Sequence, residues 1–179
     1  SSAASDVYKR QAQQQPQEAK KPNIVFIFAD DMGYGDVSAL NENSKIKTTN
    51  IDRIANEGVI FTDAHSSSSV STPSRYSVLT GRYNWRSDLK SGVLMGYNKA
   101  LIAPDRRTIA SVLKDQGYQT ACIGKWHLGW DWNNIEAGPD SVDFSKPISN
   151  GPTTRGFDYF YGIIASLDMA PYVYVENDM

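Results

Sequence analysis

The sequence predicts an α/β fold with a mainly parallel sheet flanked by helices. Short apolar runs without alternation, such as residues 24–29, are typical of strands buried on both faces. Segments with the apolar spacing of helices lie between these runs, and a glycine follows each of them. Because strands that alternate with helices build parallel sheets, these observations favour the α/β class. A chain of 179 residues is long enough to bury one core of this kind.

Four short runs are expected to be strands, and three segments are expected to be helices. The strands are Ile24–Ala29, Val59–Thr62, Gln119–Ile123 and Tyr172–Val175. The helices are Asn50–Glu57, Pro73–Leu79 and Thr108–Gln116. Asn50 and Thr72 carry polar side chains that can cap the first two helices. Ile109, Val112 and Leu113 form the inward apolar stripe expected of the third helix.

Order is expected from Pro22 onward, so that residues 22–179 form the domain and residues 1–21 precede it as a disordered segment. Residues 1–11 resemble translated adapter sequence more than natural protein. Residues 11–21 are rich in Gln, Ala and Lys, as linkers are. A linker of this kind often follows a removed export signal, so the absence of a visible signal is weak evidence for a cytoplasmic protein.

Composition argues against several classes of function. The net charge of −2 gives no overall attraction to nucleic acid or to an anionic membrane surface. No apolar run approaches the ~20 residues that a membrane-spanning helix needs. Cys122 is the only cysteine, so the chain can form no internal disulfide, and we expect this residue to be a small buried apolar group.

Asp30 and Asp31 directly follow the first expected strand. Adjacent carboxylates repel each other unless a cation lies between them, and hard oxygen ligands of this kind suit Ca²⁺ or Mg²⁺. A bare Asp-Asp pair also occurs in acidic turns with capping roles. The pair alone therefore leaves a metal site and a structural turn as alternatives.

The run Ser71-Thr72-Pro73-Ser74-Arg75 places a small hydroxyl side chain just before a proline that can open a helix. Arg75 follows Ser71 by four residues, which is about one helical turn. A nucleophile and a cation at this spacing suit attack on a tetrahedral oxyanion. The alternative is an ordinary turn, because Ser, Thr and Pro are common turn residues.

Lys125 and His127 follow the third expected strand. In an extended segment, residues two apart point to the same side, so both side chains can face one ligand. Lysine offers a point charge, and histidine exchanges a proton near neutral pH. A solvated lysine beside a structural histidine is the alternative. Because sites in parallel sheets form beyond the carboxyl ends of strands, we expect this pair, the aspartates and Ser71 to converge on one rim.

Three stretches together resemble type I sulfatases of the alkaline-phosphatase-like superfamily. They are the opening run from Pro22 to Asp36, the pattern S-x-P-S-R-x-x-x-L-T-G-R from Ser71 to Arg82, and the run Gly124-Lys125-Trp126-His127-Leu128-Gly129. The resemblance is strong over residues 22–129 and weaker over residues 156–177. It implies the N-terminal portion of a sulfatase catalytic domain. The fold would then be incomplete, with further metal ligands and a second Lys and His outside this chain.

The resemblance implies a sulfuric ester hydrolase that depends on a modified serine. Ser71 would be oxidised to formylglycine and hydrated to a diol, which attacks sulfur and afterwards expels sulfate by collapse of a hemiacetal. Arg75 would hold the diol, and Lys125 would take charge on the sulfate. His127 would position or deprotonate the diol.

The implied metal is Ca²⁺ or Mg²⁺, bound by Asp30, Asp31 and the modified Ser71. Serine instead of cysteine at the modified position points, within the family, to a bacterial protein and a serine-type, oxygen-independent maturase. The expected location is the periplasm or the exterior of the cell. The expected substrates are sulfated carbohydrates, with aryl sulfates as surrogates.

Two alternatives to a sulfatase remain open from the sequence. The first is a phosphate or phosphonate ester hydrolase of the same superfamily that uses Ser71 or Thr72 unmodified. The second is an inactive fragment or carbohydrate-binding relic that keeps the motif without maturation. An unmodified residue 71 in an active protein would favour the first, and the absence of bound metal and of sulfate release would favour the second.

Overall fold

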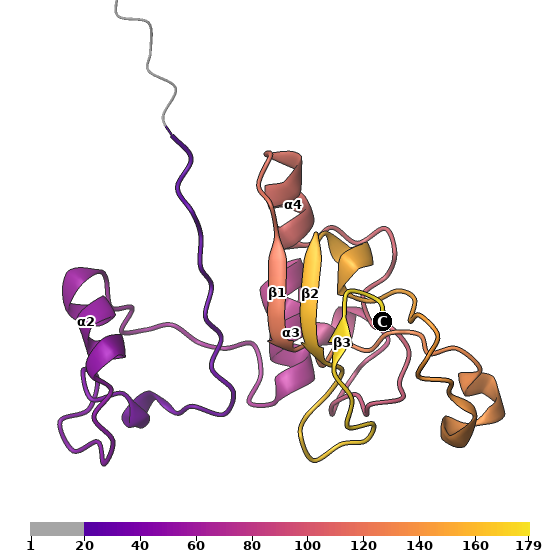
Figure 1. Ribbon diagram of the computed structural model, residues 1–179. Helices are drawn as coiled ribbons and strands as arrows, with labels where there is room; N and C mark the ends of the chain where they lie inside the picture. Colours follow the sequence, from indigo (N-terminus) through magenta and orange to yellow (C-terminus); the bar gives the residue numbers. More distant parts are fainter. Residues whose placement is uncertain (1–19) are drawn as a thin grey trace, which may run out of the picture. The chain divides into compact units, whose positions relative to one another are not determined.

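The computed structural model describes residues 20–179 and divides at Gly58 into two compact units (Figure 1). The sequence predicts a disordered segment over residues 1–21, and its residues 1–19 lie outside the part of the chain that the structure describes. The described part of the first unit contains a short 3-10 helix, η1 (Tyr34–Asp36), and one α-helix, α2 (Thr49–Glu57). The helix expected from Asn50 is thus confirmed and ends at Gly58, but the capping role expected of Asn50 was wrong, because Thr48 is the N-cap and Asn50 lies inside the helix.

Asp52 ties the first turn of α2 to the loop that precedes it. Its carboxylate accepts hydrogen bonds from the hydroxyls of Ser38 (2.5 Å) and Thr48 (2.7 Å) and from the backbone N–H of Ala39 (2.9 Å). These bonds, first of all the one from Ser38, lower the pKa of Asp52. Ile54 of the same helix is 63% exposed, so polar contacts and not an apolar stripe hold α2 in its unit.

The strands expected at Ile24–Ala29 and Val59–Thr62 are absent. Neither run has regular secondary structure, and no described residue pairs with either run in a ladder. Val25 is 82% exposed and Phe61 is 77% exposed. A strand exists through its hydrogen bonds to a neighbouring strand, and the apolar character of a run does not supply that neighbour. The sequence prediction was therefore wrong for both runs.

The second unit holds a mixed three-stranded sheet in the order β1-β2-β3 (Figure 1). β1 (Ala121–Lys125) runs parallel to β2 (Tyr159–Ile163), with residue 121 opposite residue 159. β3 (Val175–Glu176) pairs antiparallel with β2. The strands expected at Gln119–Ile123 and Tyr172–Val175 are present with shifted bounds. The α/β class is confirmed, while the expected parallel pairing holds for β1 and β2 only.

α3 (Ser71–Thr80) is the longer of the two helices in the second unit, and it begins two residues before the expected start at Pro73. Gly81 ends it in the left-handed conformation, φ 66°, and donates its N–H to the carbonyl of Ser77. Short 3-10 turns complete the unit: η2 (Asn84–Arg86), η3 (Ile135–Ala137), η4 (Pro139–Ser141) and η5 (Pro152–Arg155).

α4 (Ile109–Asp115) turns a different face inward from the one expected. Ile109 and Val112 are 53% and 45% exposed, whereas Ala110 is buried, so the predicted stripe was wrong at two positions. Gly156 explains the orientation, because a Cβ at this residue would lie 2.4 Å from a backbone nitrogen of α4. Close backbone packing at Gly156 therefore selects a small residue as the inner face of the helix.

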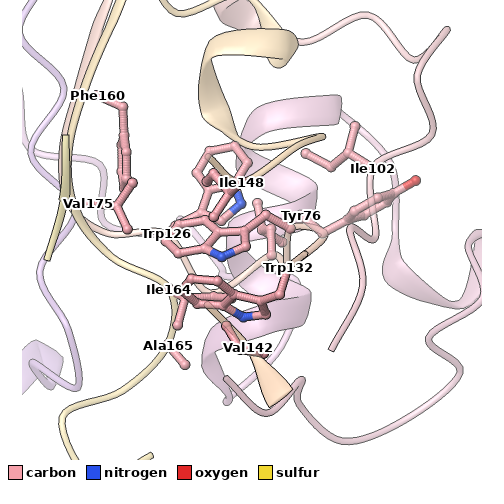
Figure 2. Packing of buried hydrophobic residues seen from close by; sticks show 12 residues of the cluster. Tyr76, Ile102, Trp126, Trp132, Val142, Ile148, Phe160, Ile164, Ala165 and Val175 are labelled. Carbon is pink, nitrogen blue, oxygen red and sulfur yellow. The ribbon is translucent and has the colours of Figure 1, made fainter. Parts of the chain in front are cut away.

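Three tryptophans form the centre of the hydrophobic core. Trp126, Trp130 and Trp132 are each at most 5% exposed. Trp130 packs edge-on against both Trp132 and Phe160 of β2. Figure 2 shows Trp126 and Trp132 lying between Phe160 on the side of the sheet and Tyr76 of α3. The core therefore joins the sheet to the helix that begins at Ser71.

Two neighbouring positions of β2 should differ sharply in their contribution to stability. Phe160 is fully buried, so Phe160→Ala should lower the free energy of unfolding by about 3–5 kcal/mol. Tyr161 points to the other face and is 43% exposed, so Tyr161→Ala should cost about 1 kcal/mol, mainly through its lost stacking on Tyr174. Urea unfolding followed by tryptophan fluorescence checks both. Equal costs at the two positions would contradict this core.

Candidate active site

Ser71 is the first residue of α3, and its hydroxyl lies at the centre of the candidate site. Val70, which precedes it, is extended, so the chain enters the helix at the serine itself. Arg75 lies one turn further along the same helix and donates from its Nε to Ser71 Oγ at 2.7 Å. The expected spacing of these two residues is thus realised, since helical geometry places residues four apart on one face.

Arg75 also joins α3 to the end of β1. Its second donor, a terminal guanidinium nitrogen, binds the carbonyl of Lys125 at 2.6 Å. A rigid fork of donors can hold a helix side chain and a strand carbonyl at the same time, and arginine supplies one. The guanidinium therefore fixes the position of Ser71 relative to β1.

His127 reaches Ser71 from the segment that follows β1. Its Nδ1 lies 3.0 Å from Ser71 Oγ, and its Nε2 lies 2.7 Å from the carbonyl oxygen of Leu94. The residue is 2% exposed and adopts a left-handed backbone conformation, φ 55°. Its backbone N–H donates to the carbonyl of Ile164 at 2.7 Å. The expectation of an extended Lys125–His127 segment was therefore wrong, because the chain turns at His127 to aim the imidazole at the serine.

The two contacts of the imidazole define its tautomer. A backbone carbonyl can only accept, so in the neutral ring Nε2 carries the proton and donates it to Leu94. Nδ1 is then an acceptor facing Ser71 Oγ. The serine oxygen accepts from Arg75, and its own proton can point at Nδ1. This arrangement is a hydroxyl aligned with a general base.

Lys125, the last residue of β1, contacts a residue that the sequence did not single out. Its Nζ donates to the hydroxyl of Ser166 at 3.2 Å, just beyond the end of β2. The hydrogen bonding between the two strands continues past the end of β1, since Trp126 N–H donates to the carbonyl of Ile163. Lys125 and Ser166 therefore lie at the carboxyl ends of two parallel strands, where sites in α/β sheets form.

Asp30 and Asp31 belong to the first unit and are exposed. Asp31 has a left-handed backbone conformation, φ 55°, as in a turn. Their carboxylates are hard oxygen donors of the kind that Ca²⁺ prefers. No three His, Cys, Asp or Glu side chains within residues 20–179 are grouped to hold a metal ion. The donor chemistry of the pair fits a cation, and its approach to Ser71 remains a prediction.

His65, Asp168 and the four tryptophans carry side chains of types that can also serve in functional sites. His65 is exposed and pairs with the carboxylate of Asp63 at 2.7 Å. Asp168 is exposed, close to Ser166 in sequence. Trp85 stacks on Tyr83 at a ring separation of 4.1 Å, and the other three tryptophans belong to the core. None of the buried tryptophans is thus available as a sugar platform.

Sequence analysis missed two groups of this site. Leu94 contributes its backbone carbonyl, and a backbone group leaves no signature in the residue type. Ser166 is a single serine in a turn, where a hydroxyl has several ordinary roles. Its place just after a strand-like aromatic run was the one available signal.

The family model for sulfatases matches residues 22–177, so the chain belongs to the sulfatase family. It is 43% identical over 162 residues to the N-acetylgalactosamine-6-O-sulfatase of Bacteroides thetaiotaomicron, and 43% identical over 150 residues to human steryl-sulfatase. A solved structure from work on glycosaminoglycan metabolism by Bacteroides thetaiotaomicron matches 89% of this chain with a TM-score of 0.78 and 43% identity. The sulfatase-like α/β fold expected from the sequence is therefore confirmed.

The chain spans only part of each of these relatives. It aligns with 90% of its own length to 30% of the Bacteroides sulfatase, and with 81% to 24% of the human enzyme. A structure titled as Ps i-CgsB in complex with k-i-k-neocarrahexaose matches 76% of this chain and 27% of its own, with a TM-score of 0.60 and 33% identity. The matched region in each is about a quarter to a third of the relative.

The surroundings of Cys122, which include the charge of Arg75, predict that its thiol is unreactive. Burial raises the pKa of Cys122 to about 11, although the positive charge of Arg75 opposes the rise. Because the thiolate is the nucleophile, iodoacetamide at pH 8 should label Cys122 in the native protein roughly 100-fold more slowly than in urea. Peptide mass spectrometry over time measures both rates. Equal labelling in the two states would contradict this placement of Cys122.

Proposed function

We propose that the full-length protein that contains this chain hydrolyses sulfate esters, with Ser71 as the reacting position. The observation that carries the proposal is the Ser71 hydroxyl held between Arg75 Nε (2.7 Å) and His127 Nδ1 (3.0 Å) in a chain of the sulfatase family. A hydroxyl with a cation on one side and a base on the other suits attack on an anionic ester.

Each side chain has a distinct role in this proposal. His127 accepts the proton of the attacking hydroxyl through Nδ1, since its other nitrogen is committed to the Leu94 carbonyl. Arg75 orients the oxygen of residue 71 and stabilises negative charge beside it. Lys125 offers its ammonium to the sulfate group, and the N-terminus of α3 adds the partial positive charge of its free N–H groups.

The surroundings of Ser71 fit a formylglycine side chain at this position. They provide two nitrogen groups directed at an oxygen on the β-carbon, which is what a hydrated aldehyde presents. Formylglycine supplies a second hydroxyl, and with it a route for sulfate to leave that a plain serine lacks. The proposed source of the modification is a serine-type maturase, because residue 71 is serine.

Asp30 and Asp31 are the proposed protein ligands of a divalent cation, Ca²⁺ or Mg²⁺, together with residue 71. Their two carboxylates have the hard oxygen chemistry that both ions require. The cation supplies charge neutralisation for an anionic ester and lowers the pKa of a bound hydroxyl. Remaining ligands would come from outside residues 20–179.

Sulfated glycans are the proposed substrate class. The supporting observations are the names of two relatives, an N-acetylgalactosamine-6-O-sulfatase and a protein crystallised with a neocarrahexaose. The proposed location is the periplasm or exterior of a bacterium. No described helix is long and apolar enough to cross a membrane.

Maturation of Ser71 should decide whether the enzyme turns over. Full-length protein co-expressed with a serine-type maturase should carry an aldehyde peptide, lighter than the serine peptide by two hydrogens. Hydrolysis of an aryl sulfate should rise in proportion to the aldehyde fraction. Without the maturase, turnover should fall by at least about 100-fold, because a serine sulfate ester has no hemiacetal route for release.

Ser71→Ala is the control in both hosts and should be inactive in each. Ser71→Cys should regain activity with a cysteine-type maturation system, since residues 72–75 are unchanged. Full sulfatase or phosphatase turnover by protein with only unmodified Ser71 would reject the formylglycine route. That result would support the phosphate or phosphonate ester alternative, in which the hydroxyl aligned on His127 attacks directly.

Replacement of the aspartates should remove the metal. Asp30→Ala and Asp31→Ala should each lower the calcium content of the full-length protein and reduce kcat/KM by more than about 100-fold. Replacing a residue that only hydrogen-bonds to a metal ligand already lowers metal affinity or activity by about 10- to 100-fold, and loss of a ligand should cost more. Asp36→Ala is the matched control, because its carboxylate accepts from the N–H of Gly33 in a local turn. Elemental analysis and calorimetric calcium titration measure the loss. Wild-type calcium binding by Asp30→Ala would refute the assignment.

A further inference from the structure

Thr72 is completely buried beside Ser71, yet its hydroxyl does not cap the helix. α3 begins at Ser71, Val70 is its N-cap, and no side chain makes the capping bond. The hydroxyl of Thr72 instead accepts the backbone N–H of Leu94 at 3.1 Å, from a residue 22 positions further along the chain. Thr72 has 0% exposure, so this bond is sheltered from water. The expectation of a capping Thr72 was therefore wrong, and its hydroxyl has another role.

Leu94 is held at one end by Thr72 and holds His127 at the other. Its N–H donates to Thr72 Oγ1, and its carbonyl accepts from His127 Nε2 at 2.7 Å. The two groups belong to the peptide units on either side of one α-carbon, so anchoring the N–H limits where the carbonyl can lie. The segment around Leu94 has no regular secondary structure, and its only other anchor beside Leu94 among the described contacts is a local turn in which the Met95 N–H donates to Asn98 Oδ1.

These contacts close a ring that contains the reacting position. Ser71 Oγ meets His127 Nδ1, His127 Nε2 meets the Leu94 carbonyl, and Leu94 N–H meets a hydroxyl on the residue after Ser71. The peptide bond between residues 71 and 72 completes the ring. The nucleophile position and the support of its base are thus adjacent on one helical turn.

We propose that Thr72 is a positioning residue, which orients the Leu94 carbonyl so that His127 keeps its proton on Nε2 and turns a bare Nδ1 toward residue 71. The catalytic consequence rests on the proposed function, whereas the tautomer of His127 does not. Without the hydroxyl, the Leu94 N–H loses its buried partner and the chain at Leu94 shifts, so that the carbonyl no longer selects one tautomer.

The direct test is the ring nitrogen spectrum of His127 in full-length protein labelled with ¹⁵N-histidine. A bare ring nitrogen resonates far from a protonated one, and His127→Gln identifies the signals. The wild-type protein should show bare Nδ1 and protonated Nε2. Thr72→Val removes the hydroxyl while keeping a similar shape, and it should give mixed tautomers. Thr72→Ser keeps the hydroxyl and should restore the wild-type spectrum.

Thr80→Val is the matched control, because its hydroxyl lies on the same helix but binds the local carbonyl of Tyr76. It should leave the His127 spectrum unchanged. A protonated Nδ1 in the wild-type protein overturns the proposal without any variant, so the test survives a Thr72→Val protein that fails to fold. A wild-type spectrum in folded Thr72→Val also overturns it.

Kinetics separate this proposal from the proposed function. In matured enzyme, Thr72→Val should lower kcat by up to about 100-fold, with KM changed less than about threefold, because misplacement of a catalytic group by about 1 Å has that cost. Thr72→Ser should recover most of the rate. An altered His127 spectrum with unchanged kcat would support the positioning role and refute the proposed role of His127 as the base.

Discussion

The parallel pairing of β1 with β2 is the constraint on which the rest of the second unit depends. Its hydrogen bonds continue beyond the ends of both strands, through the backbone N–H of Trp126 to the Ile163 carbonyl and the backbone N–H of His127 to the Ile164 carbonyl. The first places an indole in the core. The second holds His127 in its left-handed conformation, which an isolated chain would rarely adopt. One ladder thus organises both the core and the candidate site.

Arg75 connects this strand end to α3, because it donates both to the Lys125 carbonyl and to the Ser71 hydroxyl. A helix that starts at Ser71 brings its free N–H groups to the carboxyl edge of the sheet, and the guanidinium fixes its distance from Lys125. Positive charge therefore gathers at one edge in a chain whose net charge is −2. Local geometry, more than total charge, decides that an anion suits this place.

The catalytic candidates were predictable because their signals are local, whereas the elements that failed depended on distant partners. The spacing of Ser71 and Arg75 fixes their contact once a helix forms. The run Ile24–Ala29 has every local property of a buried strand, yet no described residue pairs with it. Ile109 and Val112 show the same limit, because close packing at Gly156 overrode the apolar pattern of α4.

The sequence by itself determined the α/β class, the sulfatase resemblance and the identity of the side chains around Ser71, since residue types and short spacings are written directly in the chain. Only the tertiary structure decided how these side chains act on one another. The turn at His127, the carbonyl of Leu94 and the hydroxyl of Ser166 all come from segments far from Ser71 in sequence. Their contributions are backbone directions and a common side chain, and such groups acquire meaning only when folding brings them together.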